Sequence, residues 1–427
     1  MTLICNGRVI DPASGLDQVT DVLLREGRIA KLGENLERDG CDRVIDAAGW
    51  VVAPGLVDGH VHFRDPGFPC KEDITTGAAS AAAGGFTTVV CMANTKPPVD
   101  RAEVLTELRQ RAETLPIHVL NTSTLTLGME GKELADLEGL KAAGAVAFTD
   151  DGRAVQDAAL LKRAMERSRE LGVPIALHEE DPALLESSGV HQGRISEKLG
   201  VAGASALAEE VLVARDCLLA LRTGAAIVIQ HVSSAVSVEL LRTMKALGAK
   251  VYGEVTPHHF SLNEEILLEK GTLAKVNPPI RTEEDRLALI RGLQDGAIDG
   301  IVTDHAPHTR EEKARGWAEA PSGMIGLETA LALGITNLVR PGYLSLSQLV
   351  EKMTVAPARF YGLEAGRLLA GAPADLVLFD PEERWRVGDT FWSRSSNSPF
   401  IGMELFGRVK GTICGGKAVY TDGKGRA

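Results

Sequence analysis

Histidine, aspartate and asparagine residues recur at the ends of apolar stretches in this chain. The first such stretch, residues 51–67, has the sequence VVAPGLVDGHVHFRDPG and spaces His60, His62 and Arg64 two residues apart. In an extended strand these side chains project from one face. Two imidazoles would then be available to a divalent metal ion, with a cation beside them for an anionic group of a substrate. Taken alone, the two histidines could equally be hydrogen-bonded surface residues.

Apolar stretches of this kind alternate with amphipathic segments that are rich in Ala, Leu, Glu and Arg. The strands predicted from them are residues 55–62, 87–94, 117–124, 145–151, 174–180, 226–233, 251–259 and 300–307. Short buried strands that alternate with helices over about 300 residues predict an α/β fold, a (β/α)8 barrel of the TIM type. An open doubly wound sheet is the alternative, but the glycine-rich first turn that it would need is missing.

The two ends of the chain have a different pattern, of short strands with hairpin turns at Glu26-Gly27 and Gly415-Gly416. Residues 1–53 and residues 366–427 are each too small for a stable core. We therefore expect them to pack on each other as one small composite β-sandwich, beside a barrel that occupies residues 54–365.

Charge and composition exclude several classes of function. The formal net charge is −12 and the chain has no basic run, which argues against nucleic acid and anionic membranes as partners. The N-terminal residues lack the features of a signal peptide, and no apolar stretch approaches the roughly 20 residues of a membrane span. The six cysteines are scattered without close pairs, so we expect reduced, mostly buried thiols in a cytoplasmic protein. For His118 we expect only a packing or surface role.

Catalytic groups in a barrel lie at the C-terminal ends of the strands. The predicted strand ends carry His60, His62, Asn94, Asp150, Asp151, His178, His231 and Asp304. Four imidazoles with two carboxylates suit two divalent metal ions, for which zinc is the first choice although other divalent ions could fit. The ligands that we assign are His60, His62 and Asp304 on one ion, His178 and His231 on the other, and Asp151 between them. Such ions would acidify a shared water to hydroxide, and Asp304 could carry its proton to a leaving nitrogen.

Seven segments carry a resemblance to a known family: GLVDGHVHFRDPG, CMANT, FTDDG, HEED, QHVS, VNPPIR and TDHAPH. They are similar to the motifs of the amidohydrolase superfamily and, within it, of the dihydroorotases that have an aspartate on strand four. The resemblance extends over essentially the whole chain. It implies a cyclic amide hydrolase with one or two Zn²⁺ per subunit, which cyclises N-carbamoyl-L-aspartate reversibly to (S)-dihydroorotate in de novo pyrimidine (UMP) biosynthesis.

The resemblance also implies roles for single residues. Many relatives bridge their metals with a carbamylated lysine on strand four, but this chain has no lysine there, and the motif match makes Asp151 the ligand with Asp150 as the alternative. Arg64 can hold the substrate carboxylate with a planar fork, and Asn94 adds amide donors. The further substrate contacts implied are His308, Asn277, Ser322 and Gly323. Asn277 could instead be a turn residue, and relatives usually have Phe where Ser322 stands, so only backbone donation is expected there.

Some neighbouring residues have competing interpretations. His258 and His259 are alternative ligands, but we favour a structural role because six ligands are already assigned, and we expect His305 behind the ligands. Residues 309–321 are charged and contain Gly316, which suits a mobile lid that excludes water.

Two other functions compete with the leading one. A ring-opening amidase acting on hydantoins, dihydropyrimidines or allantoin would have no reason to place Arg64 beside the metals. A metal-free paralogue that scaffolds aspartate transcarbamoylase would be expected to have lost ligands, and this chain keeps all six. Dihydroorotases of this kind can associate with aspartate transcarbamoylase, and the sequence is compatible with that association and with a homo-oligomer.

Overall fold

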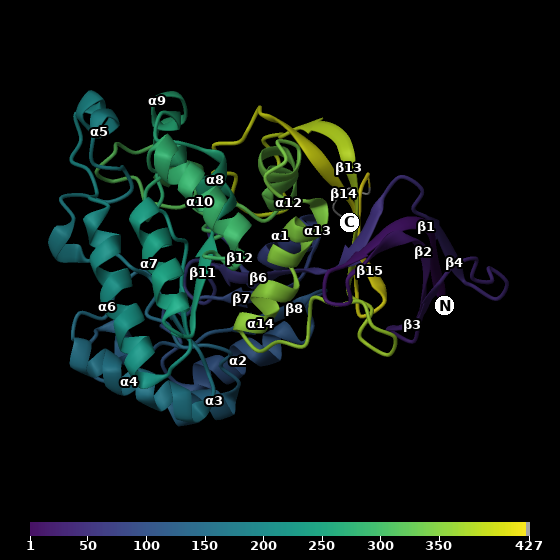
Figure 1. Cartoon of the computed structure of the whole chain (residues 1–427), viewed down its shortest axis with the longest axis horizontal. Helices are drawn as coiled ribbons and strands as arrows, with labels where there is room; N and C mark the ends of the chain where they lie inside the picture. The colour runs from purple at the N-terminus through teal and green to yellow at the C-terminus, as the bar shows by residue number, and fades with distance from the viewer. Residues whose placement is uncertain (424–427) are drawn as a thin grey trace.

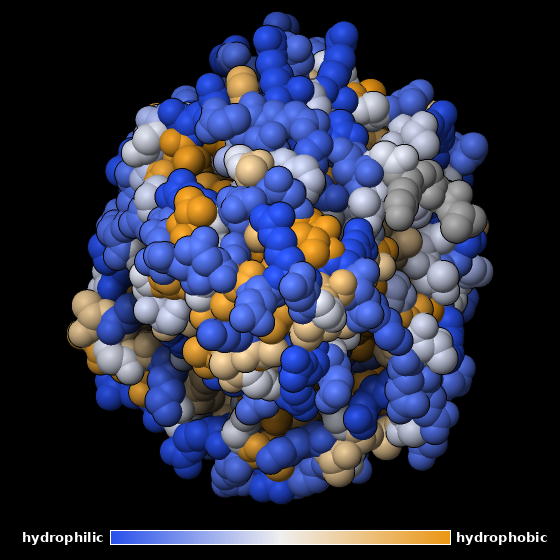
Figure 2. Space-filling view, turned by 90° about the vertical axis from the view of Figure 1, so that its right-hand side faces the viewer, coloured by the Kyte–Doolittle hydropathy of each residue, from blue (hydrophilic) through white to orange (hydrophobic). Residues whose placement is uncertain are grey.

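A helix-covered barrel and a β-sandwich lie side by side along the longest axis of the computed structural model, which describes residues 1–423 (Figure 1). The barrel helices occupy the left of Figure 1, and both ends of the chain lie in the sandwich on the right. The face of the molecule at the sandwich end is mostly hydrophilic, with hydrophobic side chains in small scattered groups (Figure 2).

Parallel strands form the barrel wall. Within residues 1–423 they are β6 (Leu56–Val61), β7 (Phe86–Cys91), β8 (His118–Asn121), β9 (Ile175–Leu177), β10 (Ile227–Ile229), β11 (Val251–Val255) and β12 (Gly300–Ile301). They pair in two groups, β6-β7-β8 and β12-β11-β10-β9. Single bridges close the ring, because Phe148 pairs with both Ser123 and Ile175, and Val61 pairs with His305.

The stretch 145–151 differs from the prediction of a fourth strand. It is reduced to the bridged residue Phe148, although Val146 N–H still donates to Asn121 C=O of the neighbouring strand β8 at 3.1 Å. The chain leaves the wall at Asp150, whose carboxylate accepts from two backbone N–H groups of the preceding loop. The other seven predicted strands are confirmed.

Amphipathic helices separate the strands where the sequence predicts them. Amphipathic segments rich in Ala, Leu, Glu and Arg form α2 (Ala102–Ala112), α4 (Ala158–Leu171), α6 (Leu207–Thr223) and α7 (Ala235–Ala246). In α4 the Asp157 carboxylate caps the first turn, and Gly172, with a φ of 67°, ends the helix in the left-handed region. Among the described residues, no helix has both the length and the apolar character needed to cross a membrane.

Shorter helices complete the barrel layer and its loops. The remaining α-helices are α1 (Ile74–Ala83), α3 (Leu137–Ala143), α5 (Arg194–Leu199), α8 (Pro257–Ser261), α9 (Ile266–Lys270), α10 (Glu283–Asp295), α11 (Arg310–Lys313), α12 (Ala330–Gly334), α13 (Leu346–Lys352) and α14 (Val355–Phe360). The 3-10 and π turns are η1 (Leu127–Met129), η2 (Pro182–Leu184), η3 (Gly271–Ala274) and η4 (Ile335–Val339).

The two ends of the chain share one eight-stranded sheet. Its strands are β1 (Thr2–Asp11), β2 (Leu16–Arg25), β3 (Arg28–Gly33), β4 (Arg43–Asp46), β5 (Val51–Pro54), β13 (Leu376–Arg386), β14 (Glu404–Cys414) and β15 (Lys417–Thr421). The order is β15-β14-β13-β5-β1-β2-β3, with β4 paired to β1, so antiparallel pairing of β5 with β13 joins the N-terminal and C-terminal segments. The predicted hairpin turn between β2 and β3 is present, with positive φ at Glu26 and Gly27.

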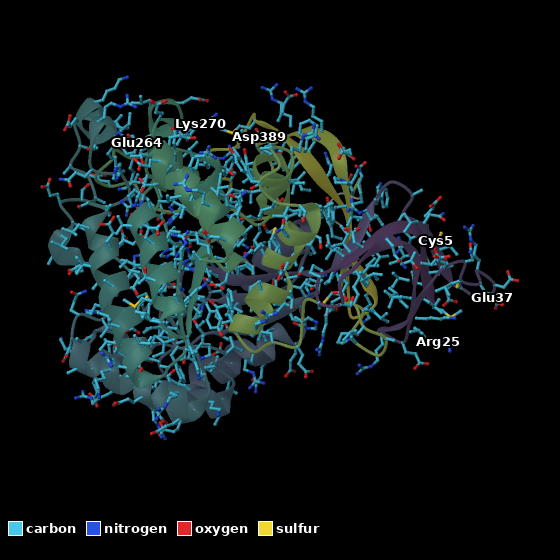
Figure 3. The ribbon with its side chains drawn as sticks, viewed as in Figure 1. Cys5, Arg25, Glu37, Glu264, Lys270 and Asp389 are labelled. Carbon is cyan, nitrogen blue, oxygen red and sulfur yellow. The ribbon has the colours of Figure 1, made fainter. Side chains whose placement is uncertain are left out.

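The connection between β13 and β14, residues 387–403, reaches over the barrel. Its Asn397 accepts a hydrogen bond from His308 N–H and donates to Gly323 C=O, each at 3.1 Å. Figure 3 labels Asp389 of this connection and Lys270 along the same edge of the molecule, and Lys270 Nζ donates to a backbone carbonyl of the connection at 3.5 Å. The sandwich segment therefore helps to position barrel loops that carry predicted substrate contacts.

Candidate active site

The side chains predicted as metal ligands converge at the C-terminal end of the barrel. His60 Nε2 and His62 Nε2 are 3.2 Å apart, and Asp304 Oδ1 lies 3.5 Å from the first and 3.0 Å from the second. A second pair comes from the ends of β9 and β10, where His178 Nδ1 and His231 Nε2 are 3.0 Å apart. The strands therefore bring five nitrogen and oxygen donors into two neighbouring groups.

Asp151 lies between these two groups. Its Oδ1 is 3.6 Å from His60 Nε2, 3.7 Å from His178 Nδ1 and 3.9 Å from His231 Nε2. Its Oδ2 is 3.5 Å from His62 Nε2. One carboxylate thus faces both histidine pairs, which is the position that a bridging ligand requires.

The competing candidates have other partners. The Asp150 carboxylate accepts from backbone N–H groups at 2.9 and 3.1 Å. His259 Nε2 lies 3.0 Å from a backbone carbonyl oxygen, and its ring packs against that of His258. His305 lies behind the ligands, with Nε2 3.5 Å from Glu72 Oε2. These contacts give each residue a structural explanation.

The donor set fits divalent metal ions. Tetrahedral zinc with nitrogen and oxygen ligands at about 2.0–2.2 Å places its ligand atoms about 3.3–3.6 Å apart. The distances between donor atoms here run from 3.0 to 3.9 Å, which spans that range. Imidazole and carboxylate are also the ligand types that zinc accepts.

The charges around these donors favour a cation. Burial opposes protonation of His60, but the carboxylates of Asp151 and Asp304 outweigh it and raise the pKa of His60 to about 9. Burial would also raise the pKa of Asp151, yet His60 and the neighbouring imidazoles hold it well below its usual range. The Asp151 carboxylate is therefore kept anionic in a buried place where positive charge must balance it.

The backbone is strained at three of these positions. Arg64, His231 and Asp304 have φ values of 58°, 35° and 48°, in the left-handed region that non-glycine residues rarely adopt. Each such residue costs about 1–3 kcal/mol and persists only where the surroundings fix it. One such support is the buried Asp58, whose carboxylate accepts from the N–H groups of His60 and Thr303 at 3.1 Å each.

A cavity of about 370 Å³ opens over the ligands. Its lining includes His62, Arg64, Asn94, Asp151, Arg153, His178, Glu180, Pro182, Leu185, His231, Asn277, Asp304, Ala306, Ser322 and Gly323. All of the substrate contacts implied by the resemblance are in this lining except His308, which lies behind Arg64. The cavity therefore brings a cation and several polar groups to the edge of the metal ligands.

The guanidinium of Arg64 is largely free for a substrate. Its Nε donates to Pro307 C=O at 3.2 Å, and its Nη2 lies 3.2 Å from His308 Nε2. Burial, Arg64 and Lys71 lower the pKa of His308, so its ring is neutral. Lys71 Nζ lies 3.2 Å from His308 Nδ1. Because an ammonium group can only donate, Nδ1 is the acceptor and the ring proton is on Nε2. This Nε2–H donates to Ser322 C=O at 2.9 Å. This tautomer cannot accept from Arg64, so four of the five guanidinium N–H groups have no hydrogen-bond partner among residues 1–423.

Two asparagines border the cavity with different contacts. The side chain of Asn94 connects His62 of the first group to the intervening Asp151, because its Oδ1 accepts from His62 Nδ1–H at 3.0 Å and its Nδ2 donates to Asp151 Oδ2 at 2.8 Å. Asn94 therefore orients ligands in addition to lining the cavity. Asn277 Oδ1 accepts from the Ser322 hydroxyl at 3.0 Å, which leaves the backbone of Ser322 as its group for a substrate.

Sequence reasoning missed two residues of the cavity wall. Glu180 Oε2 lies 3.0 Å from His178 Nε2, so this carboxylate orients the ring that offers Nδ1 to the metal position. The spacing of two residues from His178 on an extended segment was a signal that could have identified it. Arg153, in the loop after Asp151, adds a second cation to the lining, and no pattern in the sequence distinguishes it.

Comparisons with known proteins agree with this geometry. A sequence model of the Dihydro-orotase-like family matches residues 49–237. The chain is 54% identical over 420 residues to a dihydroorotase of Clostridioides difficile (strain 630), which covers 98% of this chain and 100% of the relative. It is 51% identical over 423 residues to a dihydroorotase of Clostridium acetobutylicum, which covers 99% of this chain and 100% of the relative.

The fold also has close counterparts among solved structures. The L-hydantoinase (dihydropyrimidinase) from Arthrobacter aurescens is similar with a TM-score of 0.89 and 27% sequence identity, over 100% of this chain and 97% of that chain. The predicted fold class, a TIM-type barrel with a β-sandwich built from both ends of the chain, is confirmed.

Proposed function

The chain belongs to the dihydroorotase family and is a dihydroorotase, a cyclic amide hydrolase of pyrimidine biosynthesis, and we propose that the six converging ligands and the cavity beside them are its active site. The observation that carries this proposal is the position of Asp151 between two histidine pairs, with Asp304 and Arg64 at the edge of the same cavity. The family is metal-dependent, and we propose zinc, with one or two ions per subunit.

The residues that would hold the metal are His60, His62, Asp151, His178, His231 and Asp304. When bound, a divalent ion supplies a Lewis acid that polarises a carbonyl group and lowers the pKa of water. Asn94 and Glu180 would keep the ligand side chains oriented, because each bonds a ligand in the structure.

Asp304 is the proposed proton shuttle. In ring opening, the oxygen of a water molecule bonds to the ring amide carbon while the carbon–nitrogen bond breaks. Asp304 takes the proton of that water on Oδ and delivers it to the departing ring nitrogen. In the biosynthetic direction the carbamoyl nitrogen of N-carbamoyl-L-aspartate bonds to the carbon of the protonated side-chain carboxyl group. Asp304 takes the nitrogen's proton and delivers it to the hydroxyl oxygen of that group, and the carbon–oxygen bond breaks to release water.

The substrate carboxylate that does not react needs fixed donors of its own. Arg64 can offer it two parallel N–H groups. His308, which donates to Ser322 C=O, and Asn397, which accepts from His308 N–H, support the loops beside Arg64. Asn277 and the backbone of Ser322 and Gly323 border the rest of the cavity and would contact the ring edge.

The site contains features that the competing functions do not explain. The substrates of an amidase for hydantoins or dihydropyrimidines have no anionic group to pair with Arg64, and the cavity lining contains no lysine that could be carbamylated. A metal-free scaffold would not need five ligand side chains around Asp151 with neighbouring donor atoms 3.0 to 3.9 Å apart.

Turnover of two substrates tests the proposal. Purified protein is given L-dihydroorotate and, in parallel, dihydrouracil, which has the ring but not the carboxylate, and its bound metal is measured before and after treatment with a chelator. We expect hydrolysis of dihydroorotate that is lost with the metal and restored by zinc. Preference for dihydrouracil would refute the carboxylate clamp, and full activity after removal of all metal would refute the metal site.

The setting of the reaction is part of the proposal. A cytoplasmic location is supported by the place of the reaction in nucleotide synthesis and by the free state of all six cysteines. Aspartate transcarbamoylase makes the substrate, so an association with it, or a homo-oligomer, would be compatible with this function. Size-exclusion chromatography of the protein with and without that enzyme would detect either assembly.

A further inference from the structure

Three residues with metal-ligating side chains meet on the opposite side of the barrel from the active site. His118 is the first residue of β8, so it lies at the N-terminal end of a barrel strand, whereas the active site lies at the C-terminal ends. Asp375 immediately precedes β13, and Cys414 is the last residue of β14. His118 Nε2 is 2.9 Å from Asp375 Oδ2, and the ligand atoms of all three residues lie within 4.8 Å of one another.

The fold holds these residues together through separate contacts. In the β13–β14 ladder Leu376 pairs with Ile413, and the same antiparallel register carried one step further places Asp375 opposite Cys414. Asp375 Oδ1 also accepts from the Gly415 N–H at 2.7 Å. The Cys414 Sγ lies 3.9 Å from the carbonyl oxygen of Thr87 in β7, the barrel strand beside β8. The cluster therefore joins two strands of the sandwich to two strands of the barrel.

We infer that His118, Asp375 and Cys414 form a second metal site, for a zinc-like divalent ion, at the contact between barrel and sandwich. Thiolate, imidazole and carboxylate are all zinc ligands, and soft sulfur favours zinc over the hard cations Mg²⁺ and Ca²⁺. A tetrahedral site with bonds of about 2.0–2.3 Å has ligand atoms about 3.3–3.8 Å apart. The ligand atoms of His118, Asp375 and Cys414 are between 2.9 Å and at most 4.8 Å apart, and these distances bracket the tetrahedral range. Rotation of the side chains alone can therefore bring the three atoms onto one ion.

The surroundings leave a fourth position available. His118 and Cys414 line a surface hollow of about 700 Å³ between the end of α2, β8 and β15. Cys414 and Asp375 are mostly covered, whereas the side chain of His118 is 49% exposed. An ion could therefore enter from the His118 side and keep one coordination position for water. Because it would bond both bodies of the fold, this ion would stabilise their contact and take no part in turnover.

Cobalt(II) is the probe that distinguishes this site from the active site. A thiolate bound to Co²⁺ gives a charge-transfer absorption in the near ultraviolet, and none of the proposed active-site ligands is a cysteine. The enzyme is freed of metal with a chelator and then titrated with Co²⁺, and the same titration is done with His118→Gln, Cys414→Ser and the control Cys70→Ser. Cys70 is exposed, so its replacement tests for adventitious thiolate binding. Cys5, labelled on the right of Figure 3, is in β1, which β5 and β13 separate from β14 in the sheet.

We expect a saturable thiolate band of one equivalent per chain in the parent protein and in Cys70→Ser. His118→Gln should weaken Co²⁺ binding at least about tenfold and leave dihydroorotase turnover unchanged, and Cys414→Ser should remove the band. Cys414 is buried, so Cys414→Ser could fail to fold. In that case the Co²⁺ titration of His118→Gln, whose changed residue is exposed, tests the site. Absence of the band in the parent protein, its loss in Cys70→Ser, or unchanged Co²⁺ affinity of the band in His118→Gln would overturn the inference.

Discussion

Replacing Arg64 with methionine tests how the site recognises its substrate. Methionine keeps much of the length of the side chain and removes the guanidinium. The donation to Pro307 C=O is lost, but the neutral ring of His308 keeps its bond to Ser322 C=O. The loops around the cavity should therefore stay in place, and the change should act on the substrate carboxylate.

The magnitude follows from the burial of the pair. Removing one partner of a hydrogen-bonded charge pair in a desolvated site costs about 2–5 kcal/mol. Arg64 is only partly buried in the free protein, so we expect the lower part of that range, about 2–3.5 kcal/mol, which is a roughly 30-fold to 400-fold loss of kcat/KM. Dihydrouracil has no carboxylate, so its kcat/KM should change little.

The assay compares both substrates in three proteins with equal metal content. Arg153→Met is the matched control, because it removes the other positive charge from the same cavity lining. If Arg64 binds the carboxylate, its replacement should harm dihydroorotate hydrolysis much more than the Arg153 change does. Equal losses in the two variants, or equal losses on both substrates, would refute the argument.

Three further predictions concern other parts of the site. Asp304→Asn should lower turnover by about 10²–10⁴-fold with an unchanged thermal unfolding midpoint, and near-normal activity would remove Asp304 as the shuttle. Glu180→Gln should weaken metal binding by about 10–100-fold in a chelator competition, because the ring of His178 loses its orienting carboxylate; unchanged affinity would contradict that role. Lys313 donates to three backbone carbonyls, and burial lowers its pKa to about 7. Between pH 7 and about 10.4 the unfolded chain therefore binds more protons there, so folded stability rises with pH. The free energy of unfolding of the parent protein minus that of Lys313→Met should therefore increase from pH 7 to 9, by at most about 1.4 kcal/mol per pH unit. A constant or decreasing difference, measured by urea unfolding, would disprove this role of Lys313.

The ligands can be predicted from the sequence because residues at the ends of barrel strands lie close together in space. His60, His178 and His231 are far apart in the chain, but each ends a parallel strand, and parallel strands of a barrel end at one mouth. The hairpin turns were predictable for a similar reason, since Glu26-Gly27 and Gly415-Gly416 provide the positive φ that tight turns need.

Other features depend on contacts that no local pattern contains. An apolar run such as residues 145–151 indicates burial. How many of its residues pair with neighbouring strands depends on those strands, and here only Phe148 forms bridges. Asn397 holds His308 across 89 residues. His118 meets Asp375 across 257 residues, because the packing of the sandwich against the barrel brings them together, and the sequence alone does not reveal that packing.

The lid predicted at residues 309–321 illustrates the same limit. Its charged composition suggests mobility, yet the structure anchors it from inside through Lys313 and through Lys275, whose Nζ donates to Trp317 C=O at 2.6 Å and Ala320 C=O at 2.8 Å. A lysine that turns inward to bind carbonyls has the same sequence signal as one in solvent. Composition alone could not distinguish the two.

Anomalous diffraction at the zinc edge, from crystals of the zinc-loaded protein with bound dihydroorotate, would locate the metal ions. We expect peaks on the two sides of Asp151, one against His60 and His62 and one against His178 and His231, or a single peak at one of these positions. Zinc density that contacts Asp150 or His259 and leaves Asp151 without a metal would contradict this expectation.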